Sequence, residues 1–216
     1  MPLEVRGLVS SAHSIAIRSL RSPRCRELGP SPRAPSAAAE HHEKVTDGVR
    51  YREVGDAAAP ALALLWARAE AHRRGEPMPA TVDESAVDAL RARLAEEGAT
   101  AVLGVAGDEP VAGCFATQAC LKDTTITGRA HVSGISVDPQ RWGQGLARGA
   151  LRHLEEALVT AGYDAVQLHV LETNARARSL YEHLGWRLGE LARDPAYDLE
   201  LAHPLRSHVR GSRWRR

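Results

Sequence analysis

A chain of 216 residues with 44% hydrophobic and 25% charged residues has the composition of a globular protein that can bury one core. Its formal net charge is +1, so overall charge gives no reason to expect binding to nucleic acid or to an anionic membrane. No apolar run approaches the ~18 residues of a membrane-spanning helix. We therefore expect a cytoplasmic protein without nucleic-acid or membrane partners, as a monomer or a homodimer.

The N-terminal stretch differs in composition from the rest of the chain. Residues 1–39 hold six arginines, two acidic residues and many serines and prolines, which resembles a transit peptide. A compact apolar segment with a cleavage site is missing, so a disordered extension or an upstream start codon is the simpler explanation. We expect an extension over 1–46, one folded domain over 47–204, and a solvated basic tail over 205–216.

Hydrophobic periodicity predicts the elements of the first half of the domain. They are a strand over 49–54, a helix from Asp56 to the break at 75–79, a helix from Thr81 or Asp83 to Gly98, and strands over 101–106 and 111–119 joined by a hairpin turn. Residues 121–129 are polar and predict a loop.

The second half begins with a strand over 130–137. It continues with an amphipathic helix from about Leu146 to Gly162, a strand over 165–171, a short helix over 175–184, and strands over 186–188 and 197–201. Because helices separate only some of the strands, we expect an α/β protein of the α+β type with a mixed sheet.

The strand over 130–137 leads into the most informative loop of the chain. Asp138-Pro139 ends the strand, because proline has no N–H to donate to a sheet. The loop over 140–145 contains Gly143 and Gly145, which allow a phosphate to approach the backbone closely. The helix that follows directs its N-terminal amides and the positive end of its dipole at the same place. The segment therefore predicts a pyrophosphate site.

Three interpretations of these glycines compete. In the first they only turn the chain. In the second, Gly143, Gly145 and Gly149 form a dinucleotide fingerprint with Glu172 as the ribose-binding acid. Residues 138–142 argue against it, because the fingerprint turn follows its strand directly, and too little chain remains for a doubly wound sheet. A P-loop is excluded because no Gly-Lys-Ser/Thr follows.

The third interpretation is a resemblance to a known family. Residues 140–145, QRWGQG, match the Q/R-x-x-G-x-G/A loop of the GNAT superfamily of acyl-CoA-dependent N-acyltransferases. Residues 174–186, NARARSLYEHLGW, resemble the family's N-x-x-A-x-x-L-Y-x-x-x-G-F/W signature. The two blocks stand in the family's order, and together they are strong evidence for the resemblance. The loop alone would be weak evidence.

The resemblance implies a GNAT fold, in which helices flank a mostly antiparallel sheet with one splayed parallel pair. It implies acetyl-CoA as cosubstrate and no metal. Backbone amides from Arg141 to Ala147 would hold the pyrophosphate, and the strand at 135–137 would pair with the pantetheine arm. The residues implied to bind the cofactor are Ile135, Ser136, Val137, Gln140, Arg141, Trp142, Gly143, Gln144, Gly145, Leu146, Ala147, Asn174 and Tyr181.

The same resemblance implies catalytic roles. The Val137 N–H would polarise the thioester carbonyl, where negative charge develops when an amine attacks. Tyr181, with an ordinary pKa of about 10, would protonate the leaving thiolate. Asn174 is also a good helix N-cap, and the two roles can coexist. Trp142 stands where many relatives carry a basic residue, so Arg141 or Arg148 would have to supply that charge.

The general base is the point where this chain departs from the family. Many relatives carry a glutamate two residues before the position of Ile135, where this chain has Ser133, and serine is not a base. His131, on the same strand face, is the nearest titratable replacement. A structural histidine, a water relay, or an acceptor that arrives as a neutral amine are the alternatives.

These observations predict an N-acetyltransferase that moves the acetyl group of acetyl-CoA to a primary amine by direct attack in a ternary complex. The acceptor is a small-molecule amine or, alternatively, a protein N-terminus or lysine. The alternative outside the enzymes is a non-catalytic module that binds acyl-CoA. It remains an alternative because the glutamate base is missing.

Overall fold

The computed structural model describes residues 44–46, 48–121, 124–189 and 199–205. Most of the predicted N-terminal extension and almost all of the predicted tail lie outside the described residues. The sheet begins earlier than predicted, because β1 (Lys44–Thr46) pairs antiparallel with β2 (Val49–Val54). Gly48, with φ of 75°, allows the tight turn between them.

The described residues form one eight-stranded sheet in the order β1-β2-β3-β4-β5-β6-β8-β7. The further strands are β3 (Thr100–Ala106), β4 (Glu109–Leu121), β5 (Thr124–Val137), β6 (Ala165–Val170), β7 (Arg187–Leu188) and β8 (Leu199–Pro204). Only β5 and β6 are parallel; the other neighbours are antiparallel. The predicted mixed sheet with one parallel pair is confirmed.

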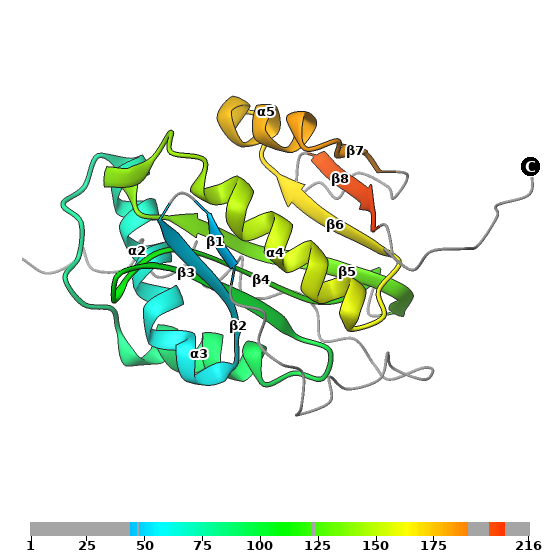
Figure 1. Ribbon diagram of the computed structural model, residues 1–216, viewed down its shortest axis with the longest axis horizontal. Coiled ribbons are helices and arrows are strands. Elements are labelled where there is room, and N and C mark those ends of the chain that lie inside the picture. The colour runs from blue at the N-terminus through cyan, green and yellow to red at the C-terminus, as the bar shows by residue number, and fades with distance from the viewer. Residues whose placement is uncertain (1–43, 47, 122–123, 190–198, 206–216) are drawn as a thin grey trace, which may run out of the picture.

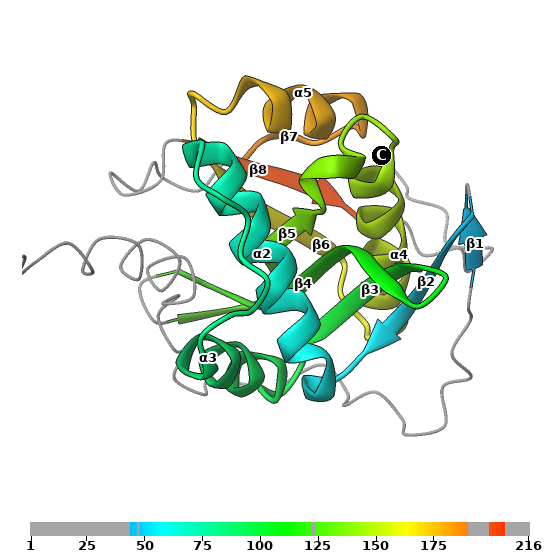
Figure 2. The same cartoon turned by 90° about the vertical axis from the view of Figure 1, so that its left-hand side faces the viewer.

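Helices cover both faces of this sheet (Figures 1 and 2). They are α2 (Ala59–Arg74), α3 (Glu84–Leu94), α4 (Leu146–Thr160) and α5 (Ala175–His183), with 3-10 turns η1 (Asp56–Ala58) and η2 (Pro139–Arg141). On one face α4 contributes Leu151, Leu154 and Leu158 to a core with β2, β4 and β6. On the other face α2 and α3 pack on β3 and on Phe115 of β4. The sheet is thus the middle of three layers.

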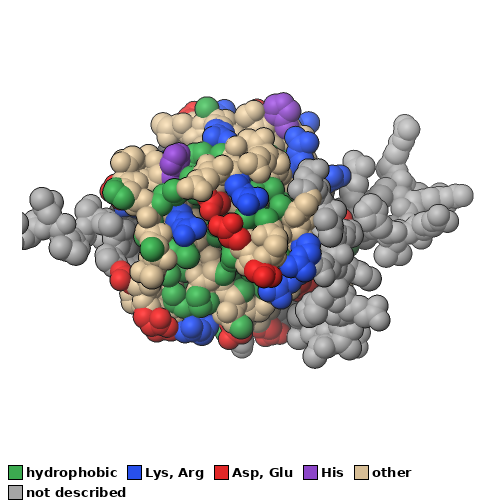
Figure 3. Space-filling view, turned by 60° about the vertical axis from the view of Figure 1, so that its left-hand side comes forward, with side chains coloured by type: hydrophobic (Ala, Val, Ile, Leu, Met, Phe, Trp, Pro, Cys, Tyr) green, Lys and Arg blue, Asp and Glu red, His purple; other side chains and the backbone are tan. Residues whose placement is uncertain are grey.

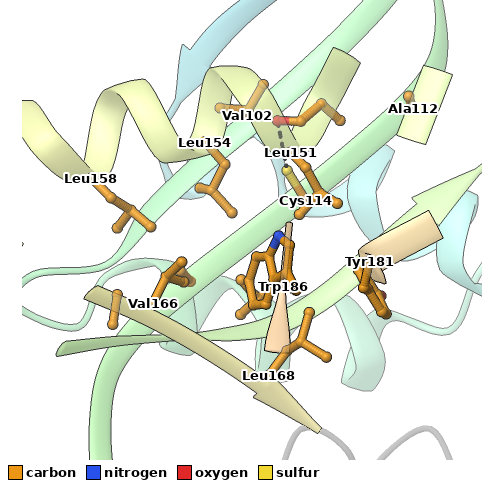
Figure 4. Close-up of a cluster of buried hydrophobic side chains, with 14 of the residues drawn as sticks. Val102, Ala112, Cys114, Leu151, Leu154, Leu158, Val166, Leu168, Tyr181 and Trp186 are labelled. Carbon is orange, nitrogen blue, oxygen red and sulfur yellow. Dashed lines mark hydrogen bonds between the residues drawn. The ribbon is translucent and has the colours of Figure 1, made fainter. Parts of the chain in front are cut away.

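The core under α4 also receives the end of the second family block (Figure 4). Trp186 is fully buried there beside Tyr181 and Leu168. The Cys114 thiol donates to the Ala150 carbonyl at 3.3 Å, which joins β4 to α4. Burying this apolar surface stabilises the position of α4, whose N-terminus carries the glycine loop.

Two local predictions are wrong. Residues 124–129 are strand and not loop, because β4 and β5 form a long hairpin in which Thr124 pairs with Leu121. These residues are mostly polar, so their alternation does not show which backbone they adopt. Asp56 lies within the turn η1 and does not cap α2, which begins without a side-chain cap bond.

Candidate active site

The parallel strands β5 and β6 separate part of the way along their length. Their pairing comprises Arg129 with Ala165, Ala130 with Val166, and His131 with Gln167. Beyond this point β5 continues on β4 as far as Val137, and β6 continues on β8. One edge of β5 over residues 132–137 therefore has no strand neighbour in the described part of the chain. We call the space beside this edge the opening.

A β-bulge lies where the opening begins. Phe115 of β4 faces Gly134, and Ala116 faces Val132, so Ser133 is the extra residue on β5. Such a bulge bends its strand and increases the twist. A Cβ at Gly134 would come within 2.3 Å of Trp66 on α2, so glycine is required for this packing.

Backbone groups at the end of β5 point into the opening. The Asp138 N–H donates to the Val111 carbonyl at 2.9 Å, which makes these two residues a hydrogen-bonded antiparallel pair. In such a ladder the neighbouring pair, Val137 with Ala112, directs its N–H and C=O away from the partner strand. The same alternation applies to Ile135. The groups predicted to meet pantetheine and the thioester carbonyl thus lie on the unpaired edge.

The first half of the loop after β5 is held by its own hydrogen bonds. The Asp138 carboxylate accepts from Gln140 N at 2.9 Å, Arg141 N bonds the Asp138 carbonyl, and Trp142 N bonds the Pro139 carbonyl. Asp138 is buried and lies 3.6 Å from the Arg68 guanidinium of α2. The amides of residues 140–142 are therefore occupied within the protein.

The second half of the loop presents amides that no group among the described residues bonds. Gly143 and Gly145 have φ of 88° and 78°, a conformation that only glycine adopts without strain. The first helical bond runs from Gly149 N to the Gly145 carbonyl. In the described part of the chain, no acceptor bonds the amides of residues 143–148. Together with the dipole of α4, the amides at 143–147 are the candidate anion site, whereas the predicted amides of Arg141 and Trp142 are already bonded to Asp138 and Pro139.

Trp142 connects this loop to two helices. Its indole Nε1 donates to the Val137 carbonyl at 2.9 Å. The His72 ring of α2 meets the indole edge-on, with centroids 4.8 Å apart, and the Arg176 guanidinium of α5 lies 4.8 Å from the ring centroid. Arg176 thus places a cation beside the loop where sequence comparison with the family suggested that one was missing. No signal in the sequence pointed to Arg176, because the contact joins two distant segments.

Asn174 caps the helix of the second family block. Its side-chain oxygen accepts from Ala177 N at 3.2 Å, which confirms the predicted N-cap. The cap fixes the start of α5 and with it the place of Arg176. A contact between Asn174 and a cofactor stays a prediction.

Tyr181 lies on the α4 side of the sheet. It is 5% exposed, and its ring packs on Trp186 with centroids 5.7 Å apart (Figure 4). Burial, and to a smaller extent the nearby Cys114, raise the pKa of Tyr181 to about 12. The phenol therefore stays protonated at neutral pH and can act as a hydrogen-bond donor.

His131 lies on the opposite face of the sheet. It pairs across the ladder with Thr117, and its ring is 5.1 Å from that of His169 on β6. Burial, then His169, then Arg93 lower the pKa of His131 to about 3. His131 is therefore neutral at pH 7, but with this pKa it is a weak acceptor for an ammonium proton.

Arg93 of α3 lies on the same face of the sheet as His131, and it was not predicted from the sequence. Its guanidinium lies 3.1 Å from the Thr117 hydroxyl and 3.4 Å from that of Ser133. Arg93 follows Leu90 by three residues, so a charged residue on the apolar face of a helix was the available signal.

The low pKa of His131 predicts an acid-sensitive contribution to stability. Between pH 6.5 and about 3 the unfolded chain binds a proton at His131 that the folded chain does not, so stability is lost as pH falls through this window. Between pH 7.5 and pH 5 the free energy of unfolding should fall less in His131→Asn than in the wild type. Urea unfolding at each pH measures it. His183→Asn, at an exposed position, is the control. An equal loss in all three proteins would contradict the prediction.

Other features of the described residues bear on ligands. Within them no three His, Cys, Asp or Glu side chains form a group that could hold a metal ion. None of the described helices is long and apolar enough to cross a membrane. On the face drawn in Figure 3, acidic and basic side chains are interspersed among apolar ones, so neither sign of charge dominates the described part of that surface.

A mixed sheet with one parallel pair, flanked by helices, is the fold that solved acetyltransferases share. The pattern that describes the Acetyltransferase (GNAT) family matches residues 62–186. The chain therefore belongs to the GNAT family of acetyltransferases.

Two curated relatives are similar in sequence. The chain is 30% identical over 189 residues to the mycothiol acetyltransferase of Beutenbergia cavernae, a match that covers 85% of this chain and 61% of the relative. It is 34% identical over 92 residues to the [ribosomal protein bS18]-alanine N-acetyltransferase of Salmonella typhimurium, which covers 43% of this chain and 58% of the relative. The chain thus spans about three fifths of the length of these relatives.

Solved structures share the fold. The ribosomal-protein-S18-alanine N-acetyltransferase of Escherichia coli superposes with a TM-score of 0.56 at 20% identity, over 77% of this chain and 99% of that one. The PaiA N-acetyltransferase of Thermoplasma acidophilum, solved in complex with coenzyme A, superposes with a TM-score of 0.54 at 12% identity. The match covers 72% of this chain and 98% of that one. At such identities the likeness concerns the fold alone.

Proposed function

We propose that this protein transfers the acetyl group of acetyl-CoA to a primary amine by direct attack in a ternary complex. One observation carries the proposal: the unbonded amides at 143–147 lie next to the unpaired edge of β5 at Val137. A diphosphate and an amide-containing arm joined in one ligand fit this combination. The glycine loop and the edge of β5 would hold acetyl-CoA, which supplies the activated acetyl group.

The residues around the opening divide the chemistry between them. The Val137 N–H donates a hydrogen bond to the carbonyl oxygen, on which charge develops as the new C–N bond forms and the C–S bond breaks. Tyr181 donates a hydrogen bond to the departing sulfur. With a pKa of about 12, above the ~8.5 of a thiol, it stabilises the thiolate more readily than it gives up its proton. The proton lost by the amine then reaches sulfur or solvent.

The acceptor belongs to one of two chemical classes. One relative is named as an acetyltransferase of mycothiol, a small molecule, and another as one of an alanine in a ribosomal protein. A non-catalytic acyl-CoA-binding protein is the second candidate function, because the position expected to hold a glutamate base is Ser133, and the nearby His131 is a weak base.

The proposed function is tested in two steps. Titration calorimetry of the full chain measures coenzyme A binding, and thiol release from acetyl-CoA is then followed with a panel of amines and peptides. Binding with amine-dependent thiol release supports the enzyme. Binding without release supports the non-catalytic candidate, and absence of binding contradicts both.

Arg176 should contribute to cofactor affinity. We expect Arg176→Ala to raise the Kd of coenzyme A by roughly 5- to 20-fold, because it removes a cation beside the loop that holds the phosphates. The control is Arg178→Ala, which removes the same charge from α5 at a residue that instead contacts Glu172 and Glu182. Equal effects of both substitutions would show that Arg176 acts only through net charge.

A further inference from the structure

Arg93 is a charged residue in an unusual place. It lies in the last turn of α3 and is 8% exposed, although arginine is almost never fully buried unless it is paired. Its guanidinium points toward the sheet, where it contacts side chains of β4 and β5. Removing a charge from water costs several kcal/mol unless partners compensate for it. The contacts of this guanidinium are therefore informative.

Those contacts leave the guanidinium incompletely paired. One terminal nitrogen donates to Glu96 at 3.1 Å, and the other to the hydroxyls of Thr117 at 3.1 Å and Ser133 at 3.4 Å. The Nε is buried and has no hydrogen-bond partner among the described residues. Glu96 is itself 35% exposed on its side chain, so solvent weakens that ion pair. A buried unpaired donor of this kind indicates that a further acceptor belongs beside it.

The cluster lies at the closed end of the opening, where β5 and β6 begin to separate. Thr117 pairs with His131, the last residue at which β5 and β6 are still joined, and Ser133 is the bulged residue that follows. The face is the one covered by α2 and α3, opposite to Tyr181 and α4. The two sides of the opening thus differ: a phenol lies on one, and a buried arginine that contacts Glu96 and two hydroxyls lies on the other.

This arrangement reverses the charge expected for a family member. A glutamate at position 133 would attract a cationic amine and accept its proton. Here Ser133 is neutral, His131 is uncharged at pH 7, and Arg93 is a permanent cation. A plain ammonium group would be repelled from this cluster, whereas an oxyanion would be attracted to it.

We propose that Arg93, with Thr117 and Ser133, binds a carboxylate of the acceptor, so that the acceptor is an amine that also bears a free carboxylate. The Nε and the neighbouring terminal nitrogen form the edge of arginine that binds a planar carboxylate in a fork. Binding there places the acceptor beside the edge of β5, at the end of the opening where β5 and β6 separate. The proposal rests on the proposed function and specifies its acceptor.

The test compares matched pairs of ligands on the full chain saturated with coenzyme A. The pairs are the α-amino acids, β-alanine and γ-aminobutyrate, each against its own amide, with calorimetry as readout. The amide keeps the amine and side chain but removes the carboxylate charge. We expect at least one acid to bind 10-fold or more tightly than its amide. If no acid binds more tightly than its amide, the proposal is wrong.

Two variants locate the effect. Arg93→Gln should reduce the preference for the acid to about one, with the Tm measured to confirm folding. Ser133→Glu should also remove the preference, because the new carboxylate occupies the place beside Arg93. An unchanged preference in a folded variant would place the carboxylate elsewhere and overturn the assignment.

The same experiment separates this inference from the proposed function. If coenzyme A itself does not bind, the proposed function fails, and the acceptor assignment that rests on it fails with it. If coenzyme A binds and the acids and amides are bound equally or not at all, only the carboxylate site fails. A preference for phosphate-bearing amines over carboxylate-bearing ones would also count against it.

Discussion

Replacing Gly145 by glutamate should abolish measurable binding of coenzyme A, with a Kd at least ~100-fold higher than that of the wild type. Gly145 has φ of 78°, which a residue with a Cβ adopts only with strain, and it precedes the first amides of α4. The substitution also places a negative charge at an anion site. Titration calorimetry measures the Kd.

The control for this prediction is Gly48→Glu. Gly48 has φ of 75° and no atom within 4 Å of an added Cβ, so the variant carries the same strain and charge at the turn between β1 and β2. We expect it to bind coenzyme A normally. If Gly145→Glu retained affinity within 10-fold, the loop would not be the phosphate site, and the first interpretation of its glycines, as turn residues only, would stand.

Tyr181→Phe should lower kcat by about 100-fold with little change in the Kd of coenzyme A, because the lost hydroxyl acts on the departing sulfur and not on the bound ground state. The ring that packs on Trp186 is kept, so folding should be preserved. Single-turnover thiol release, with an acceptor found in the amine panel, measures the chemical step. An unchanged kcat would remove Tyr181 from the mechanism.

Tyr163→Phe is the matched control for Tyr181→Phe. Tyr163 is also buried, and its hydroxyl donates to the Gly98 carbonyl, away from the opening. Its pKa is likewise raised to about 12, chiefly by burial. Because a group with a pKa of about 12 stays protonated below that value, neither tyrosine should produce a fall in rate between pH 7 and pH 10. A fall in that range would have to come from another group.

Much of the fold followed from local pattern. The strand at 49–54 and the start of α4 at Leu146 were predicted at the residues where they lie, because apolar periodicity and glycine or proline breaks mark them. The stretch 124–129 was predicted wrongly, because a polar hairpin has no buried face to produce a pattern. The early start of the sheet at Lys44 was also missed.

The candidate site was predicted in part. The two family blocks placed the glycine loop and Tyr181, and the register of β5 puts the Val137 N–H on the unpaired edge. Arg93 and Arg176 were not foreseen, because each acts through a contact with a residue far away in the chain, Ser133 or Trp142. A charge on the apolar face of α3 was visible, but its partners were not.

The sequence by itself determined the loop at 140–145 and the helix behind it, because a glycine that must adopt positive φ and a helix dipole are local properties of the chain. It also showed that Ser133 replaces an expected base. Only the structure showed that the backbone amides of residues 140–142 bond to Asp138 and Pro139. Only the structure showed, too, that a buried arginine lies beside Ser133. The contact between Arg93 and Ser133 depends on how α3 packs on β4 and β5, and packing between distant segments leaves no periodicity in the sequence.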